Sequence, residues 1–152
     1  MPIDDLGVVS PWVAQAHSGA MLSGQTARMR KQYHFWPGER GMDAWDVDRL
    51  IEVTADLPIE EVPLTELQEV DSVYWFNFSQ RPTVRNVVEH FRLVKEVDPR
   101  HPIILGPDNR VMDGMHRVAR ALLEDQTRIA AVRLRTLPDP DYRDCHPEDL
   151  PY

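Results

Sequence analysis

The sequence contains a single cysteine, Cys145, in 152 residues. One thiol cannot form an intramolecular disulfide and leaves no cysteine-rich zinc site, so a disulfide-stapled fold is excluded. No apolar run approaches the roughly 20 residues that a membrane-spanning helix needs. The N-terminus also lacks the charged-then-apolar pattern of a signal peptide. We therefore expect a cytoplasmic protein that does not enter a membrane.

Positive charge is also scarce. The chain has 17 Lys and Arg against 25 Asp and Glu, which gives a formal net charge of −8. A general nucleic-acid binder neutralises phosphates with a basic face, so this balance argues against DNA binding. It still allows a local basic pocket or a protein partner.

The residues that are present favour a folded domain. A hydrophobic content of 42% with four Trp argues against disorder, and 152 residues suggest one domain. We predict an N-terminal arm over residues 1–42, a domain over 43–137, and an extended, Pro-rich tail over 138–152 that packs on the domain. The arm includes a short helix predicted from Pro11. It also carries the main basic cluster, which we interpret as solvated: Arg28, Arg30, Lys31 and Arg40.

The most informative stretch runs from residue 102 to 134. An apolar run, Ile103 to Leu105, is followed by a turn over residues 106–109 and a second short strand over 110–112. After Asp113-Gly114 the apolar spacing changes from 2 to about 3.6, which predicts a helix from Met115. A third apolar run covers residues 129–134. The pattern is hairpin, sharp turn, helix, strand.

The turn and the start of this helix read Asp113-Gly114-Met115-His116-Arg117. The first helical turn has N–H groups without intrahelical partners and carries partial positive charge. A glycine lets a ligand approach the backbone, and His and Arg add side-chain donors, so the combination suits a phosphate. The plainer interpretation, in which Asp113 caps the helix and Arg117 is solvated, stays open.

Other elements can be predicted around this stretch. Helical spacing predicts a helix over Asp43–Asp56 and a second one that opens at Pro82-Thr83 and closes at Asp98-Pro99. The second has an apolar stripe that leaves Arg85 and His90 outside it: Val84, Val87, Val88, Phe91 and Val94. Ile59–Pro63 alternates like a strand, followed by a turn or short helix over residues 64–67. The aromatic run from Val73 to Phe78 is either core or an aromatic wall for a ligand.

The string DGMHR between a strand and a helix, with PIIL upstream and IAAVRL downstream, resembles the ParB/sulfiredoxin fold. ParB proteins have GERR at this turn, sulfiredoxins GCHR and free-serine kinases DGHxR. The chain is also similar to small stand-alone bacterial proteins labelled ParB-like, through WDVDRL (45–50), YWF (74–76), PTVR (82–85) and the DLPY tail. The resemblance covers the chain from about Trp36 onward. It implies an α+β fold, a small mixed sheet with flanking helices, here with an N-terminal helical extension.

The resemblance also implies roles for the motif. Gly114 and the amides of Met115 and His116 would cradle a phosphate, Arg117 would clamp its charge, and His116 would act as a donor or as an acid or base. Asp113 would orient the turn or help to hold Mg²⁺. In a separate segment, Arg85 would be the equivalent of an arginine that reaches the nucleotide in ParB proteins.

Departures from the motifs of these families exclude some of their functions for this chain. Met115 stands where sulfiredoxins have their cysteine, which excludes sulfinic acid repair by that mechanism. No stretch after Leu134 has the pattern of a helix-turn-helix or dimerisation domain, so we do not expect centromere binding. Free-serine kinases use an acidic base from another segment, for which Glu60 or Glu61 is the first candidate.

These observations predict a nucleotide- or phosphate-binding domain, which would act as a phosphotransferase or an NTP hydrolase. The expected ligand is ATP, ADP, CTP or another phosphorylated small molecule, accompanied by Mg²⁺. The alternative is a non-catalytic module that senses a nucleotide or binds a protein. A nuclease is the weakest prediction, because a nuclease normally needs several metal-binding carboxylates and a basic groove.

Overall fold

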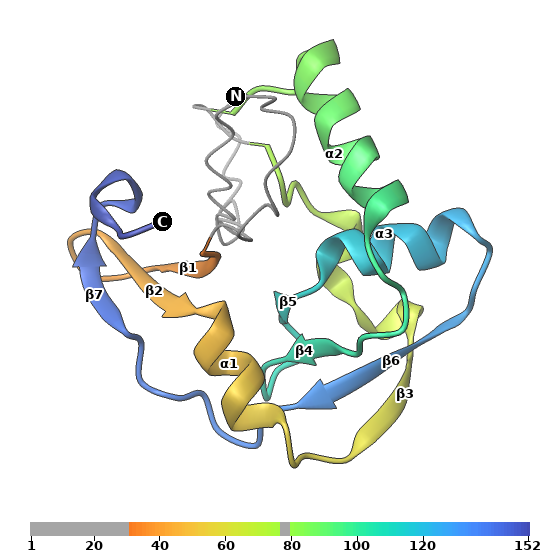
Figure 1. Cartoon of the computed structure of the whole chain (residues 1–152), viewed down its shortest axis with the longest axis horizontal. Coiled ribbons are helices and arrows are strands. Elements are labelled where there is room, and N and C mark those ends of the chain that lie inside the picture. Colours follow the sequence, from red (N-terminus) through yellow and green to blue (C-terminus); the bar gives the residue numbers. More distant parts are fainter. Residues whose placement is uncertain (1–30, 77–79) are drawn as a thin grey trace, which may run out of the picture.

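The computed structural model describes residues 31–76 and 80–152 (Figure 1). Within these residues the fold is α+β, with two small sheets and three α-helices. The helix predicted from Pro11, and with it the N-terminal helical extension, lies outside the described residues, as do Arg28 and Arg30. None of the described helices has the length and apolarity to cross a membrane.

The first sheet joins the two ends of the described chain. Its strands are β1 (Tyr33–Pro37), β2 (Met42–Asp46) and β7 (Tyr142–Cys145), in the order β1-β2-β7 with antiparallel pairing throughout. The Tyr33 hydroxyl donates to the carbonyl of Pro151 at 2.8 Å. The chain after residue 138 therefore supplies a strand of this sheet, followed by a 3-10 helix, Pro147–Asp149.

The second sheet has four strands in the order β3-β6-β4-β5. These are β3 (Ile59–Pro63), β4 (Ile103–Leu105), β5 (Val111–Asp113) and β6 (Arg128–Arg133). β4 and β6 are parallel and the other pairs antiparallel. The strands predicted after Pro58 and within residues 102–134 are thereby confirmed, and β5 forms one edge of the sheet, next to the turn that leads to α3.

This second sheet is buried on both faces, because alternate residues of a strand point to opposite sides. Ile103, Leu105 and Val111 pack with α3 (Met115–Leu123) in one core cluster. Ile104 and Met112 pack on the other side with residues of β2 and α1. The continuous apolar run of β4 follows from this arrangement, since every side chain of that strand is enclosed.

The first predicted helix begins later than expected. Residues 42–46 form β2, and α1 spans only Val47–Thr54. The Asp46 carboxylate accepts a hydrogen bond from the Asp48 amide and caps α1, while Trp45 is buried. The prediction of a helix from Asp43 was wrong because pairing with β1 overrides the helical spacing of these residues.

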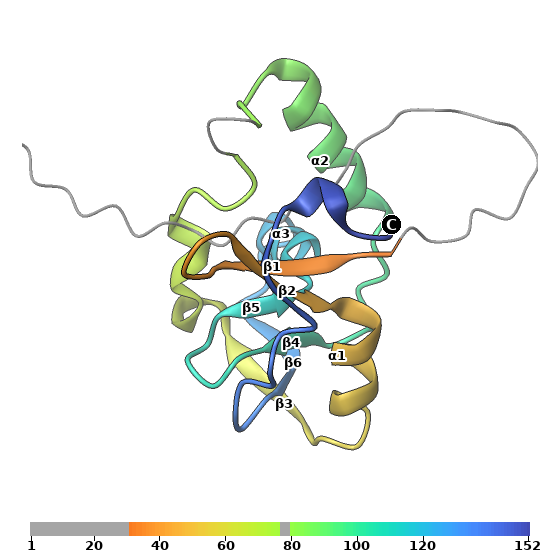
Figure 2. The same ribbon diagram turned by 90° about the vertical axis from the view of Figure 1, so that its left-hand side faces the viewer.

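The second predicted helix is confirmed as α2 (Val84–Glu96), with Thr83 accepting a hydrogen bond from the Asn86 amide as its N-cap. Its apolar stripe is nevertheless largely solvent-exposed, with Val84 82% and Phe91 51% accessible. Val94 is the only residue of the stripe that is buried, and the other buried side chain of α2 is His90, outside the stripe. The helix extends away from both sheets in both views (Figures 1 and 2), and only its C-terminal half reaches the core.

A buried histidine lies where the two sheets meet. His34 on β1 is 4% exposed, and its Nδ1 has no hydrogen-bond partner among the described residues. Burial, assisted by the nearby Arg110 charge, lowers the pKa of His34 to about 4. The imidazole is therefore neutral in the folded chain at neutral pH.

This burial predicts a specific pH dependence of stability. Between the ordinary pKa of 6.5 and the folded value of about 4, the unfolded chain binds a proton that the folded chain does not. The free energy of unfolding should thus fall as pH drops through this window, by roughly 3 kcal/mol from His34. Denaturant unfolding of the wild type and of His34→Gln at several pH values measures the difference.

The matched control is His146→Gln, because His146 is exposed. We expect this variant to keep the wild-type slope between pH 4 and 6.5 and His34→Gln to flatten it. An equally steep profile in His34→Gln would show that His34 is not the group responsible.

Candidate functional site

The turn between β5 and α3 depends on Gly114. This residue has φ of +107°, and a Cβ placed on it would lie 2.7 Å from Ile103 Cγ2 and 2.8 Å from Arg117 Nη2. The backbone conformation is one that L side chains rarely adopt, and the space is already filled. Only glycine fits here, and the Arg117 guanidinium packs directly against it.

Arg117 stabilises this turn through an ion pair and two hydrogen bonds. Its Nη2 lies 2.6 Å from Asp113 Oδ2, and its Nη1 donates to the carbonyls of His101 at 3.2 Å and Pro102 at 3.1 Å. The side chain is only 11% exposed. Arg117 is therefore not solvated, and no side chain caps α3, so the plainer interpretation of the turn was wrong on both points. The ion pair ties the end of β5 to the first turn of the helix.

Among the described residues, no side chain caps the N-terminus of α3. The first hydrogen bond of the helix runs from the Val118 amide to the Gly114 carbonyl at 3.0 Å. The preceding amides, those of Met115, His116 and Arg117, have no acceptor within the helix, and the helix dipole adds partial positive charge. The Met115 side chain is buried in the core, so this residue can offer a ligand only its amide.

His116 belongs to a stacked cluster that joins α3 to α2. Its Nε2 lies 3.0 Å from His90 Nδ1. The Trp75 ring stacks on both imidazoles, at 4.7 Å and 15° from His90 and at 4.9 Å and 13° from His116. Phe76 meets His90 edge-on at 5.4 Å. Three segments that are remote in sequence therefore converge beside the N-terminus of α3.

This cluster can donate, accept and pass on a proton. A hydrogen bond between two imidazole nitrogens needs one nitrogen with a proton and one without, so one proton lies between His90 and His116. Trp75 adds a flat apolar surface, and its Nε1 is a buried donor with no partner among the described residues. A ligand that binds the α3 amides would lie next to the His90–His116 pair and to Trp75.

Arg85 lies on the first turn of α2 and is exposed. His90 pairs with His116, and Arg120 of α3 donates to the carbonyls of Lys95 and Val97, so the C-terminal half of α2 packs on α3. In Figure 1 the two helices cross rather than run alongside each other, and the N-terminal half of α2 leads away from α3. Arg85 lies ~7.5 Å along the helix axis from His90. Among the described residues no contact joins it to the turn.

The acidic residues offer little to a metal. Among the described residues no three His, Cys, Asp or Glu side chains are grouped in a way that would hold an ion. Asp113 Oδ2 is taken by Arg117, which leaves Oδ1. One carboxylate oxygen suits Mg²⁺ only if phosphates and water supply the other ligands. Glu60 pairs with Arg133, and both Glu60 and Glu61 lie on β3, at the opposite edge of the sheet from β5.

One supporting residue was missed from the sequence. Glu69 Oε1 accepts a hydrogen bond of 2.6 Å from the Val111 amide, while the Tyr74 hydroxyl donates to the Val111 carbonyl at 3.1 Å. Burial raises the pKa of Glu69. Both backbone groups of Val111 are thus held by side chains, which fixes the strand that leads into the Gly114 turn.

No protein-family model matches the chain, and no curated protein or solved structure shows significant similarity to it. The candidate site is therefore interpreted from its own residues. The structure brings together Asp113, Gly114, Met115, His116 and Arg117, adds His90 and Trp75, and leaves Arg85 at a distance.

We predict that Gly114→Ala lowers the free energy of unfolding by at least about 2 kcal/mol, because the methyl group meets Ile103 and the backbone is strained. Gly106→Ala is the control. Gly106 has an ordinary φ, and its added Cβ would meet Asp108 Oδ1 at 3.2 Å, a side chain that can move. We expect a change below about 1 kcal/mol there. Equal losses in urea unfolding would contradict this account of the turn.

We also predict that Glu69→Ala lowers the free energy of unfolding by about 1–3 kcal/mol, because the Val111 amide loses its acceptor. Glu69→Gln should cost much less, since its amide oxygen can accept the same bond without a buried charge. The two variants, compared at pH 7, separate the hydrogen bond from the charge. A glutamine variant as unstable as the alanine variant would show that the carboxylate itself is needed.

Proposed function

We propose that the chain is a nucleotide- or phosphate-binding domain of the ParB/sulfiredoxin type. The observation that carries this proposal is the uncapped N-terminus of α3, which follows Gly114 and has the His116–His90 pair beside it. Amides without an acceptor inside the helix, together with the positive helix end, can form an anion site. The succession β4, β5, Gly114, α3, β6 around a mixed sheet supports the likeness to that fold.

In this proposal the backbone at Gly114, Met115 and His116 holds a phosphate, and the His116 ring donates to it. Arg117 acts mainly as a positioning residue, since Asp113 and two carbonyls already occupy much of its guanidinium. Arg85, on the projecting part of α2, would contact a group attached to that phosphate. Such a contact requires a ligand that extends beyond the phosphate, as a nucleotide does.

A transfer or hydrolysis reaction would follow from the same arrangement. Positioning and charge supply most of the catalysis in phosphoryl transfer. For this step His116 Nδ1 would carry no proton and would not donate to the phosphate: it would take the proton of the attacking hydroxyl or water, while the Nε2 proton passes to His90 Nδ1. The attacking oxygen would bond to the phosphorus as the bond to the leaving phosphate breaks. Mg²⁺, held by Asp113 together with the phosphates, would neutralise charge on the transferred group.

We expect micromolar binding of at least one nucleotide among ATP, ADP, CTP and GTP, with and without Mg²⁺, in calorimetric titrations. Binding should shift the NMR amide signals of residues 115–117. His116→Ala should weaken affinity about tenfold or more, which corresponds to about 1.4 kcal/mol. Circular dichroism should confirm that the variant is folded.

The matched pair for the nucleotide contact is Arg85→Ala and Arg92→Ala. Both residues lie on α2 and line the same shallow depression, but Arg92 is two turns further from the N-terminal end of the helix. Only Arg85→Ala should reduce affinity. The absence of binding by nucleotides and by inorganic phosphate, or shifts confined to other residues, would refute the proposed function.

The second candidate is a non-catalytic protein-interaction module, and the exposed apolar face of α2 favours it. Val84, Val87, Val88 and Phe91 are each more than 40% accessible. Contiguous exposed apolar surface on a projecting helix is typical of an interaction site. Val87→Glu, at an exposed position outside the depression that Arg85 lines, would abolish such an interaction while leaving nucleotide binding intact, so the two functions can be tested separately.

A further inference from the structure

A separate cavity of about 220 Å³ lies where the two sheets meet. It is lined from four parts of the chain: the strands β1 and β2, the β4–β5 turn, β5 itself, and the segment after β6. The side chains that line it include His34, Trp36, Trp45, Arg110, Met112 and Leu137. Aromatic and apolar groups therefore form most of the wall.

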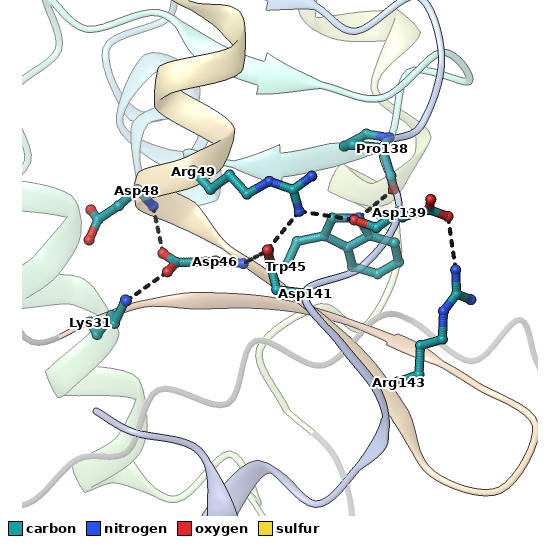
Figure 3. A network of polar contacts seen from close by, with 9 residues as sticks. All are labelled: Lys31, Trp45, Asp46, Asp48, Arg49, Pro138, Asp139, Asp141 and Arg143. Atoms are coloured by element: carbon teal, nitrogen blue, oxygen red, sulfur yellow. Dashed lines mark hydrogen bonds and ion pairs between the residues drawn. The ribbon is translucent and has the colours of Figure 1, made fainter.

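The wall is held in place by polar contacts, which Figure 3 shows. The Trp45 indole donates to the Pro138 carbonyl at 2.8 Å, so this ring and the segment after β6 are fixed to each other. Arg49 of α1 donates to Asp141 at 2.6 Å and to the Asp139 carbonyl at 3.2 Å. These bonds attach the segment after β6 to α1 and to Trp45, so this side of the cavity is fixed without a ligand.

The polar groups of the cavity carry little net charge. Arg110 lies with its guanidinium carbon 3.6 Å above the Trp36 ring and pairs with Asp108 at 2.8 Å, so its charge is balanced. His34 is enclosed, and its Nδ1 is a buried polar atom without a partner among the described residues. A buried polar group without a hydrogen bond is costly, so a ligand that induces the His34 ring to turn and supplies a partner to this nitrogen gains affinity here.

We propose that this cavity binds a small, uncharged, planar nitrogen heterocycle, of the size of one or two fused rings, which hydrogen-bonds to His34. The indole rings of Trp36 and Trp45 in the wall favour a flat, apolar ligand. The volume admits a group of nucleobase size and little more. A neutral His34 and a balanced Arg110–Asp108 pair disfavour a charged ligand, since desolvating a charge without a counter-charge is expensive.

This site is independent of the one at Gly114. Met112 points into the cavity, whereas its neighbour Val111 points into the core beneath α3, so the two sites lie on opposite faces of the four-stranded sheet. The proposal therefore does not rest on phosphate binding at the α3 N-terminus. Either can fail without the other.

Benzimidazole is the probe, because it is neutral at pH 7.5 and has one ring N–H donor and one ring acceptor. It can satisfy His34 in either tautomer. We expect a Kd between about 0.1 and 1 mM, in line with so small a ligand, measured by NMR from side-chain signals of Trp36, Trp45 and Met112. Benzamidinium and benzoate, which are planar but charged, should bind at least tenfold more weakly. Equal or tighter binding of either would overturn the proposed ligand class.

Variants locate the binding. Leu137 lies at the rim and is 52% exposed, so Leu137→Trp should block the cavity without affecting folding. Leu123→Trp adds the same ring at an exposed position of α3 and should bind benzimidazole like the wild type. His34→Phe, where it folds, should lose at least about tenfold in affinity. Undetectable binding at 10 mM, or unchanged binding in Leu137→Trp, would refute the site.

Discussion

The burial of the four-stranded sheet on both faces is the constraint on which the rest of the structure depends. β4 is only three residues long, and all three of its side chains are below 4% exposed. A sheet of such short strands is stable only when both faces are covered. α3 covers one face, while α1 and β2 cover the other. Each covering layer meets the sheet next to β5, and each meeting point contains one of the two candidate sites.

The Gly114 turn shows how the fold shapes the chemistry. A glycine at φ +107° allows the chain to pass from an edge strand into a helix within one residue, and it leaves space that the Arg117 guanidinium fills. The arginine then neutralises Asp113 and holds two carbonyls of the segment before β4. Arg117, which the motif suggested as a clamp for the charge of a ligand, therefore mainly stabilises the turn. The groups of the motif that could contact a ligand are the backbone amides and the His116 ring.

Much of the second sheet and α3 could be predicted, because residues 102–134 carry local signals: an apolar run, a Pro-Asp-Asn turn, Asp-Gly, and a change of period. The start of α1 could not. Trp45 fits a helical stripe and a buried strand equally well, and its partner β1 is close in sequence but weak in pattern. The apolar stripe of α2 was equally misleading, since periodicity identifies a helix but does not show which face the core covers. His90, outside the stripe, is buried, and of the stripe itself only Val94 is.

The two candidate sites also differ in how far the sequence reveals them. Residues 113–117 are consecutive, so the sequence displays them together. The partners of His116 come from a loop and from another helix, and nothing local in Trp75 or His90 indicates that their rings will stack. The sequence gives even less indication of the cavity at His34, because its lining residues span more than a hundred positions. The proposal for that cavity rests on one buried imidazole nitrogen, His34 Nδ1, which has no partner in the part of the chain that the structure describes. In a chain with abundant hydrogen-bonding groups, such an atom is retained at a cost in stability that a ligand can offset.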